Sequence, residues 1–296
     1  MSRPVSSSVA LCVAAAGIGS YAAMDTAMKG LSLASGAYSA VLWRSIAGVA
    51  MLAPIHLMRG GRWPGRPALA LHVARGAIAG ASVILFFWGL VRVPMAQGVA
   101  LTFLAPLIAL FLAGAMLGER IRRAAVGGSL IASLGVLAIA AGQVQARASE
   151  QAVLGSVAIL IASFLYAGSL ILLRRQAQIA DPLEVALFTS IVLGMLLLAG
   201  APWFAEVPAA GQVPMIVLTG VLGSASAVAL AWAYRHAEAQ VLAPVEYTAF
   251  AWAALFGWLA FGERVSPYTV AGAVLIIGGC LVAVRRPAIP PTELAA

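Results

Sequence analysis

Residues 94–120 read PMAQGVALTFLAPLIALFLAGAMLGER, an apolar run that ends in a charged turn. The run is long enough to cross a bilayer as a helix, which takes roughly 20 mainly apolar residues. Its pattern returns later in the chain, first at a spacing of 143 residues and then of 144. The matches are Ala96-Gln97 with Ala239-Gln240, Ala100 with Ala243, Gly118-Glu119-Arg120 with Gly262-Glu263-Arg264, Gly128 with Gly272, and Gly135 with Gly279. The sequence therefore predicts two related halves, residues 1–148 and 149–296.

Composition indicates a membrane protein. Of the 296 residues, 62% are hydrophobic and 9% are charged, whereas soluble domains carry about 25% charged residues. The net charge of +8 comes from basic residues in short loops, not from a basic stripe interleaved with aromatics, so nucleic acid is not an expected partner. Cys12 and Cys280 each lie in an apolar run and predict neither a disulfide nor a metal site.

Ten apolar runs of membrane-spanning length are predicted, five in each half. They are 8–28, 36–58, 68–91, 94–117, 123–142, 154–173, 182–201, 212–234, 240–261 and 267–284. The first run also resembles a secretory signal peptide, but a helix there completes the count. Because five is odd, the halves should have opposite orientations, as in many secondary transporters. The predicted fold is an all-α membrane protein of ten transmembrane helices in two inverted five-helix repeats. A duplicated protein that transports nothing is the alternative.

Loop charges predict the orientation of these spans. With a cytoplasmic N-terminus, twelve basic residues fall on the cytoplasmic side and four on the other. The cytoplasmic set is Arg3, Arg59, Arg62, Arg66, Arg120, Arg122, Arg123, Arg174, Arg175, Arg235, Arg285 and Arg286, and the opposite set is Lys29, Arg92, Arg147 and Arg264. Positive charge concentrates in cytoplasmic loops. Both termini are therefore predicted to face the cytoplasm of a bacterial inner membrane.

Further motifs flank the repeated ones. In the first half they are Arg75-Gly76, Phe86-Phe87-Trp88, Pro94-Met95-Ala96-Gln97, Ala105-Pro106-Leu107 and Leu117-Gly118-Glu119-Arg120. In the second they are Ala233-Tyr234-Arg235, Ala239-Gln240, Ala243-Pro244, Tyr247, Phe261-Gly262-Glu263-Arg264 and Gly272-Ala273. Together they resemble the drug/metabolite transporter superfamily, EamA type. The resemblance implies a secondary carrier, usually an exporter of small metabolites, that does no chemistry on its substrate.

The resemblance leaves the substrate open. Bacterial amino-acid exporters of the YddG type are the nearest functional model, so we expect export of small amphipathic metabolites, with amino acids favoured, by alternating access. A vitamin or nucleoside carrier of the same fold is the first alternative, and a membrane sensor or scaffold is the second. The repeated Gly-Glu-Arg turns are expected to orient paired helices.

Four charged residues, away from the span ends, are singled out within the predicted spans: Asp25, Arg44, Arg75 and Glu246. A charge at mid-bilayer costs about 2.5–3.5 kcal/mol on insertion scales, so such residues usually face the protein interior and have partners. We predict two ion pairs, Asp25 with Arg44 and Arg75 with Glu246, the second joining the two halves. They would act as a gate or bind the amino and carboxylate groups of a substrate. Neutralising buried charge is the alternative role.

Other candidate site residues are aromatic or proline. Tyr21, Trp43 and Trp252 lie near mid-depth and, with Tyr247, Arg75 and Glu246, form the predicted substrate site; packing against lipid is the alternative for the aromatics. Pro106 and Pro244 are predicted to kink their helices, because proline lacks a backbone donor.

Enzyme signatures are not found in the sequence, which contains no metalloprotease, nucleophile-elbow or phosphate-loop motif. The three histidines, His56, His72 and His236, are expected near the membrane interface. The expected partners are a small-molecule substrate and the lipid bilayer, without a cofactor, a metal or an obligatory protein partner. Coupling to protons is left open.

Overall fold

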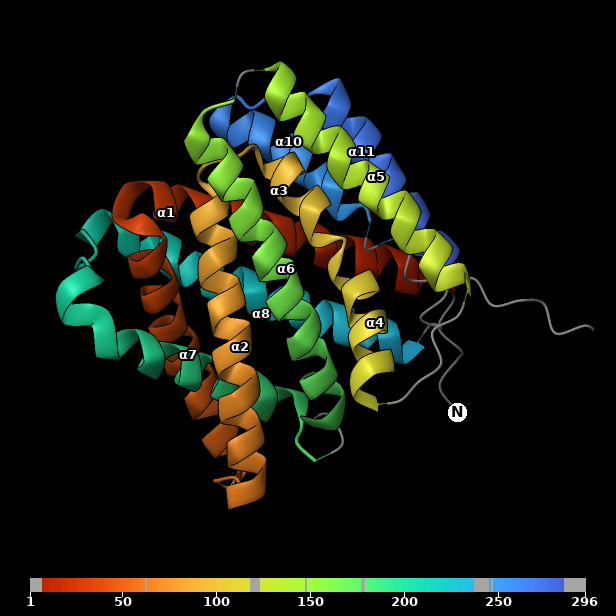
Figure 1. Ribbon diagram of the computed structural model, residues 1–296. Helices are drawn as coiled ribbons and strands as arrows, with labels where there is room; N and C mark the ends of the chain where they lie inside the picture. Colours follow the sequence, from red (N-terminus) through yellow and green to blue (C-terminus); the bar gives the residue numbers. More distant parts are fainter. Residues whose placement is uncertain are drawn as a thin grey trace, which may run out of the picture.

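The computed structural model describes residues 7–61, 63–117, 123–146, 148–176, 179–236, 245 and 247–284, which form helices and connecting turns without strands. In chain order the elements are α1 (Ser7–Met58), α2 (Arg66–Leu90), α3 (Met95–Thr102), α4 (Ala105–Leu117), α5 (Arg123–Gln145), α6 (Glu150–Gln176), α7 (Pro182–Phe204), the 3₁₀ turn η1 (Ala210–Gln212), α8 (Val213–His236), α10 (Ala249–Phe261) and α11 (Pro267–Val284) (Figure 1). The all-α class predicted from the apolar runs is confirmed for these residues.

Two helical segments make up α1, and they meet at Gly36. This residue has φ 76° and ψ 149°, a conformation that is open to glycine and strained for residues with a Cβ. Figure 1 shows the first segment running across the molecule and the second turning sharply away from it. The segments correspond to the first two predicted spans. The loop expected between them is instead helical up to Gly36, so the turn is made at a single residue.

The fourth predicted span is broken at Phe103 and Leu104. Their N–H groups donate to the carbonyls of Ala100 and Leu101, each over 3.3 Å, in tight turns between α3 and α4. Pro106 is the second residue of α4, where its missing N–H costs no helical hydrogen bond. The predicted kink is therefore a full break just before the proline. Pro244 lies outside the described residues.

Several helices are suited to cross a membrane. Five are long and apolar enough: Val9–Met58, Arg66–Leu90, Val126–Gln145, Glu150–Leu173 and Leu183–Phe204. Shorter apolar helices occupy Met95–Ala109, Ala210–Ser226, Ala249–Phe261 and Pro267–Val282. Large apolar side chains are exposed along α5 and α7, including Leu130, Leu134, Met195 and Leu198. Lipid can cover such surface, and the chain is a multi-pass membrane protein.

Three long helix pairs build the bundle: α1 packs along α8, α2 along α6, and α5 along α11. Figure 1 shows α2 beside α6 and α5 beside α11. Glycines allow close approach in the last pair, because a Cβ added to Gly135 would lie 2.6 Å from the Gly272 carbonyl oxygen, and the reverse distance is also 2.6 Å. Small residues at helix contacts are typical of membrane bundles.

Candidate functional site

A polar cluster lies among α1, α2, α6 and α7. We call six residues the central cluster: Tyr21, Asp25, Arg44, Arg75, Tyr166 and Thr189. Electrostatic interactions link Tyr21 with Asp25, Arg44 and Tyr166. Tyr166 interacts in turn with Arg75, and the Arg75 Nη1–H donates to Thr189 Oγ1 over 2.8 Å. The structure thus brings three of the four predicted intramembrane charges into one network, which Tyr21 and Tyr166 connect.

Asp25 and Arg44 interact without touching. Their charges attract each other, but no direct ion pair joins them, although both are described. Asp25 is 8% exposed, and no hydrogen bond from a described residue reaches its carboxylate. Arg44 extends toward α8, where its Nη2 would lie 3.7 Å from a Cβ placed on Gly223. The predicted direct pair is therefore not made, and both groups retain capacity for another partner.

Arg75 is also incompletely paired within the described chain. One guanidinium nitrogen reaches Thr189, while its buried Nε has no hydrogen-bond partner. Its predicted partner, Glu246, lies outside the described residues, so the Arg75–Glu246 pair stays a prediction. A buried cation with unused donors can accept a carboxylate, which pairs well with a planar guanidinium.

The remaining predicted aromatics lie elsewhere. Trp43 donates its indole N–H to the carbonyl of Glu206 over 2.8 Å, at the turn after α7. Trp252 packs against Gly19 of α1 and stacks on Phe256 with ring centroids 5.6 Å apart. Tyr247 meets Phe103 edge to face, with centroids 5.3 Å apart. Trp43 lies at the turn after α7, and the roles of Trp43, Trp252 and Tyr247 in substrate binding stay predictions.

A buried ion pair closes one end of the bundle. The Lys29 Nζ donates to a carboxylate oxygen of Glu263 and to the carbonyl of Val93, the latter over 2.7 Å. The second Glu263 oxygen accepts the Met95 N–H over 2.7 Å, which satisfies a free donor at the start of α3. Lys29 is 3% exposed and Glu263 18%. We call this set the Lys29 junction.

A second polar contact between the two halves lies near the start of α2. The His72 Nε2 is 3.0 Å from Glu184 Oε1, and Gln176 approaches the other ring nitrogen. This contact, the His72 junction, joins α2 to α6 and α7. It precedes Val93 of the Lys29 junction by 21 residues, or about 30 Å along a helix. The two junctions therefore mark opposite ends of the bundle.

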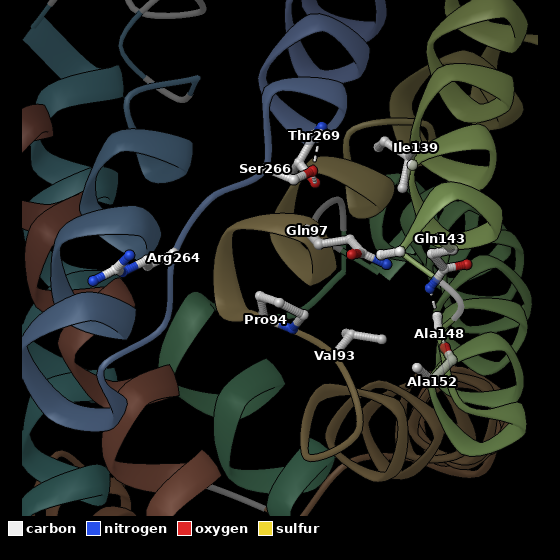
Figure 2. A pocket seen from close by; sticks show the side chains of 12 residues that line it. Val93, Pro94, Gln97, Ile139, Gln143, Ala148, Ala152, Arg264, Ser266 and Thr269 are labelled. Atoms are coloured by element: carbon white, nitrogen blue, oxygen red, sulfur yellow. Dashed lines mark hydrogen bonds between the residues drawn. The ribbon is translucent and has the colours of Figure 1, made fainter.

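A pocket of about 190 Å³ adjoins the Lys29 junction. Figure 2 shows Val93, Pro94 and Gln97 on one side of it, Gln143 and Ala152 on the other, and the Arg264 guanidinium pointing away. Gln97 and Gln143 both donate Nε2–H to Ser156 Oγ, over 3.0 and 2.7 Å. The pocket thus combines a polar rim with the backbone that Lys29 holds.

Sequence reasoning missed both junctions. Lys29 counted only as a loop charge, and His72 only as an interfacial residue. The repeated Gly-Glu-Arg turn was the available signal for Glu263, whose contact with Met95 agrees with the expectation that this turn orients helices. The matching turn at Gly118-Glu119-Arg120 lies outside the described residues. The partners of Lys29 and His72 are 234 and 112 residues away, and one sequence holds no information on that pairing.

Membrane carriers place polar and charged side chains inside an apolar helical bundle, where they mark substrate pathways, and this chain has the same arrangement. The sequence profile of the EamA-like transporter family matches residues 8–141 and 153–285, and the chain belongs to that family. It is 25% identical over 267 residues to the pseudopaline exporter CntI of Pseudomonas aeruginosa, covering 90% of this chain and 92% of that one.

The names of two other relatives indicate different substrates. A riboflavin transporter of Brucella anthropi is 26% identical over 90% of this chain and 95% of its own. A probable terminal-alkyne amino-acid exporter of Streptantibioticus cattleyicolor is 31% identical over 74% of this chain and 73% of its own. A solved crystal structure, 21% identical, matches with a TM-score of 0.61 over 94% of this chain and 96% of that chain, so the fold is shared.

Proposed function

We propose that this EamA-family transporter is a ten-helix secondary carrier whose halves, residues 1–148 and 149–296, have opposite orientations in the membrane. Two matching hydrogen bonds support this. Ser82 Oγ donates to the Ala162 carbonyl and Ser226 Oγ to the Gly17 carbonyl, each over 2.7 Å. The serines are 144 residues apart and their acceptors 145, which is close to the repeat spacing. When each residue is replaced by its counterpart in the other half, the Ser82–Ala162 contact becomes the Ser226–Gly17 contact, as a two-fold relation requires.

The contact between α5 and α11 supports the same relation. Gly135 lies against Gly272, and Gly279 lies against Gly128. The repeat matches Gly128 with Gly272 and Gly135 with Gly279. These are therefore one contact made twice, at the place where a two-fold axis would pass.

The two junctions fit alternating access. Lys29 joins the first half to Glu263 of the second, and His72 joins the first half to Glu184 of the second. In a carrier of inverted repeats, the halves rock about a site near the membrane midplane. Each junction would then open in turn while the other holds the bundle closed.

The central cluster favours a zwitterionic amino acid as substrate, and this is the observation that carries the proposal. Arg44 and Arg75 can bind a carboxylate, and Asp25 can bind an ammonium group. Tyr21 and Tyr166 interact with each other and are 46% and 48% exposed, so both rings keep accessible surface for a ligand beside the charged groups. The named amino-acid exporter among the relatives points to the same class.

A vitamin carrier is the second candidate, and the riboflavin transporter among the relatives favours it. Binding an uncharged ring system such as that of riboflavin does not require one acidic and two basic side chains at the site. We therefore rank amino acids first. The direction of transport is proposed as export across a bacterial inner membrane, with both termini cytoplasmic, because the loop charges are distributed twelve to four.

Transport into proteoliposomes tests the substrate class. A panel of labelled amino acids and riboflavin should identify an amino acid as the preferred substrate. Asp25→Asn should lose transport at normal membrane abundance, and Glu150→Gln, an exposed change in the first turn of α6, should not. Transport of riboflavin alone would establish the vitamin carrier. No transport of any solute by folded protein would favour the sensor or scaffold.

A further inference from the structure

His72 is a fully buried titratable group that substrate binding does not use. It is 1% exposed and lies on α2 between two polar partners. Its Nε2 is 3.0 Å from Glu184 Oε1 on α7, and its Nδ1 faces the amide nitrogen of Gln176 on α6. The ring also stacks on Phe188, with centroids 4.7 Å apart. Both ring nitrogens therefore have a fixed partner.

These partners can serve both charge states of the ring. In the neutral form Nε2–H donates to Glu184, and Nδ1 accepts from the Gln176 amide. Gln176 is itself 1% exposed, and its Oε1 has no hydrogen-bond partner. If the amide turns over, this oxygen can accept from a protonated Nδ1. With the ring neutral or protonated, the Gln176 amide therefore has one of its two polar groups unpaired. The protonated ring differs in that it is also attracted by the Glu184 carboxylate.

Few other charges surround this group. Near this end of the bundle the packed elements carry Arg66 and Arg75 on α2, Arg174 and Arg175 on α6, Asp181 and Glu184 at the start of α7, and His56 and Arg59 around the end of α1. Asp181 accepts the N–H groups of Leu183 and Glu184 as a helix cap, and Arg75 bonds Thr189. Among the described side chains, Glu184 is the charged one in contact with the ring.

We propose that His72, Glu184 and Gln176 form a proton-binding site, and that its occupancy controls whether α2 and α7 stay together at this end of the bundle. The proton adds to the free electron pair of Nδ1 and leaves from the same atom. Bound, it converts the hydrogen bond from a neutral ring to the Glu184 carboxylate into an ion pair between the two halves of the chain. Histidine is the side chain suited to exchange protons near neutral pH.

A role in coupling follows, and it rests on the proposed function. Proton loading would stabilise the closed His72 junction, and proton release would ease its opening. A carrier with this device can use a pH gradient to drive its substrate. For one proton exchanged per substrate, one pH unit sustains about a tenfold concentration ratio.

Histidine NMR of the full-length protein in nanodiscs tests proton binding without any substrate. The His72 ring signal, assigned by its loss in His72→Gln, should move between pH 5 and 9. Glu184→Gln should change this response, because the carboxylate that pairs with the charged ring is gone. A His72 signal that stays constant over this range, or a midpoint that Glu184→Gln leaves in place, would overturn the proton site.

Gradient-driven transport tests the coupling. With the transported amino acid as probe, one pH unit should change wild-type accumulation by about tenfold, and His72→Gln should lose that response. His56→Gln, a buried histidine change outside the junction, should keep it. A full response in His72→Gln would overturn the coupling role. If wild-type protein transports nothing, the proposed function fails while the NMR titration still decides the proton site.

Discussion

Replacing Lys29 by methionine should destabilise the protein by roughly 3 kcal/mol, because the ion pair that it breaks is buried. Lys29 is 3% exposed and Glu263 is 18% exposed. Exposed ion pairs contribute about 0–1 kcal/mol, whereas removing one partner of a buried pair costs about 3–5 kcal/mol. The remaining Glu263 carboxylate keeps the Met95 N–H, and a hydrogen bond to a charged group retains about 1.5–3 kcal/mol. The loss should therefore lie near the lower limit.

The partner variant should behave in the same way. Glu263→Gln keeps an oxygen for the Met95 N–H but leaves the Lys29 ammonium with the Val93 carbonyl alone. The double variant removes both charges, so it should lose less than the sum of the single losses. We expect a coupling of about 1–3 kcal/mol between the two sites.

Reversible unfolding in mixed detergent micelles measures these free energies for the wild type, both single variants and the double variant. Arg264→Gln, an exposed neighbour of Glu263, is the matched control and should change stability by less than about 0.5 kcal/mol. Two results together would refute the reasoning that the Lys29 junction holds this end closed. The single variants would lose no more unfolding free energy than the control, and the loss in the double variant would equal the sum of the single losses.

Three further predictions concern the repeat and the central cluster. Ser82→Ala and Ser226→Ala should each cost about 1 kcal/mol of unfolding free energy, in equal measure, because each removes one buried hydroxyl donor from the same contact made twice; strongly unequal losses would count against the two-fold relation. Gly135→Ala should cost about 1–3 kcal/mol in the same assay, while Gly127→Ala, with open space around its Cβ, should be neutral or stabilising; equal effects would argue against close α5–α11 packing. Arg75→Gln should weaken substrate binding by roughly 10- to 100-fold at normal membrane abundance, since it removes a charged hydrogen bond; unchanged binding would remove Arg75 from the site.

Much of the fold follows from the sequence, because a helix must pair its own backbone groups in lipid. Apolar runs therefore locate helices, and the class needs no tertiary information. The breaks were harder to predict. Gly36 turns the chain within one residue, so the expected loop does not exist. The turns at Phe103 and Leu104 interrupt an apolar run, and Pro106 predicted a kink there but not a full break.

For the candidate site too, the sequence predicted some features and missed others. The cost of a charge in lipid singles out Asp25, Arg44 and Arg75 in the sequence, and the structure gathers them. The cost of a charge in lipid did not predict which residue each of these side chains would contact. Arg75 bonds Thr189 through a contact 114 residues distant in sequence. Such contacts depend on how the helices pack, which a single sequence does not encode in any local pattern.

The measurement that tests alternating access most directly is a pair of distances in one protein. Spin labels at Leu33 and Arg264 report on the Lys29 end, and labels at Ala70 and Ile179 report on the His72 end, all at exposed positions. Cys12 and Cys280 are first replaced by serine. Pulsed electron resonance should show that Lys29→Met lengthens the Leu33–Arg264 distance while the Ala70–Ile179 distance stays short. If both distances lengthen together, or neither changes, the two ends do not open in turn and the account is contradicted.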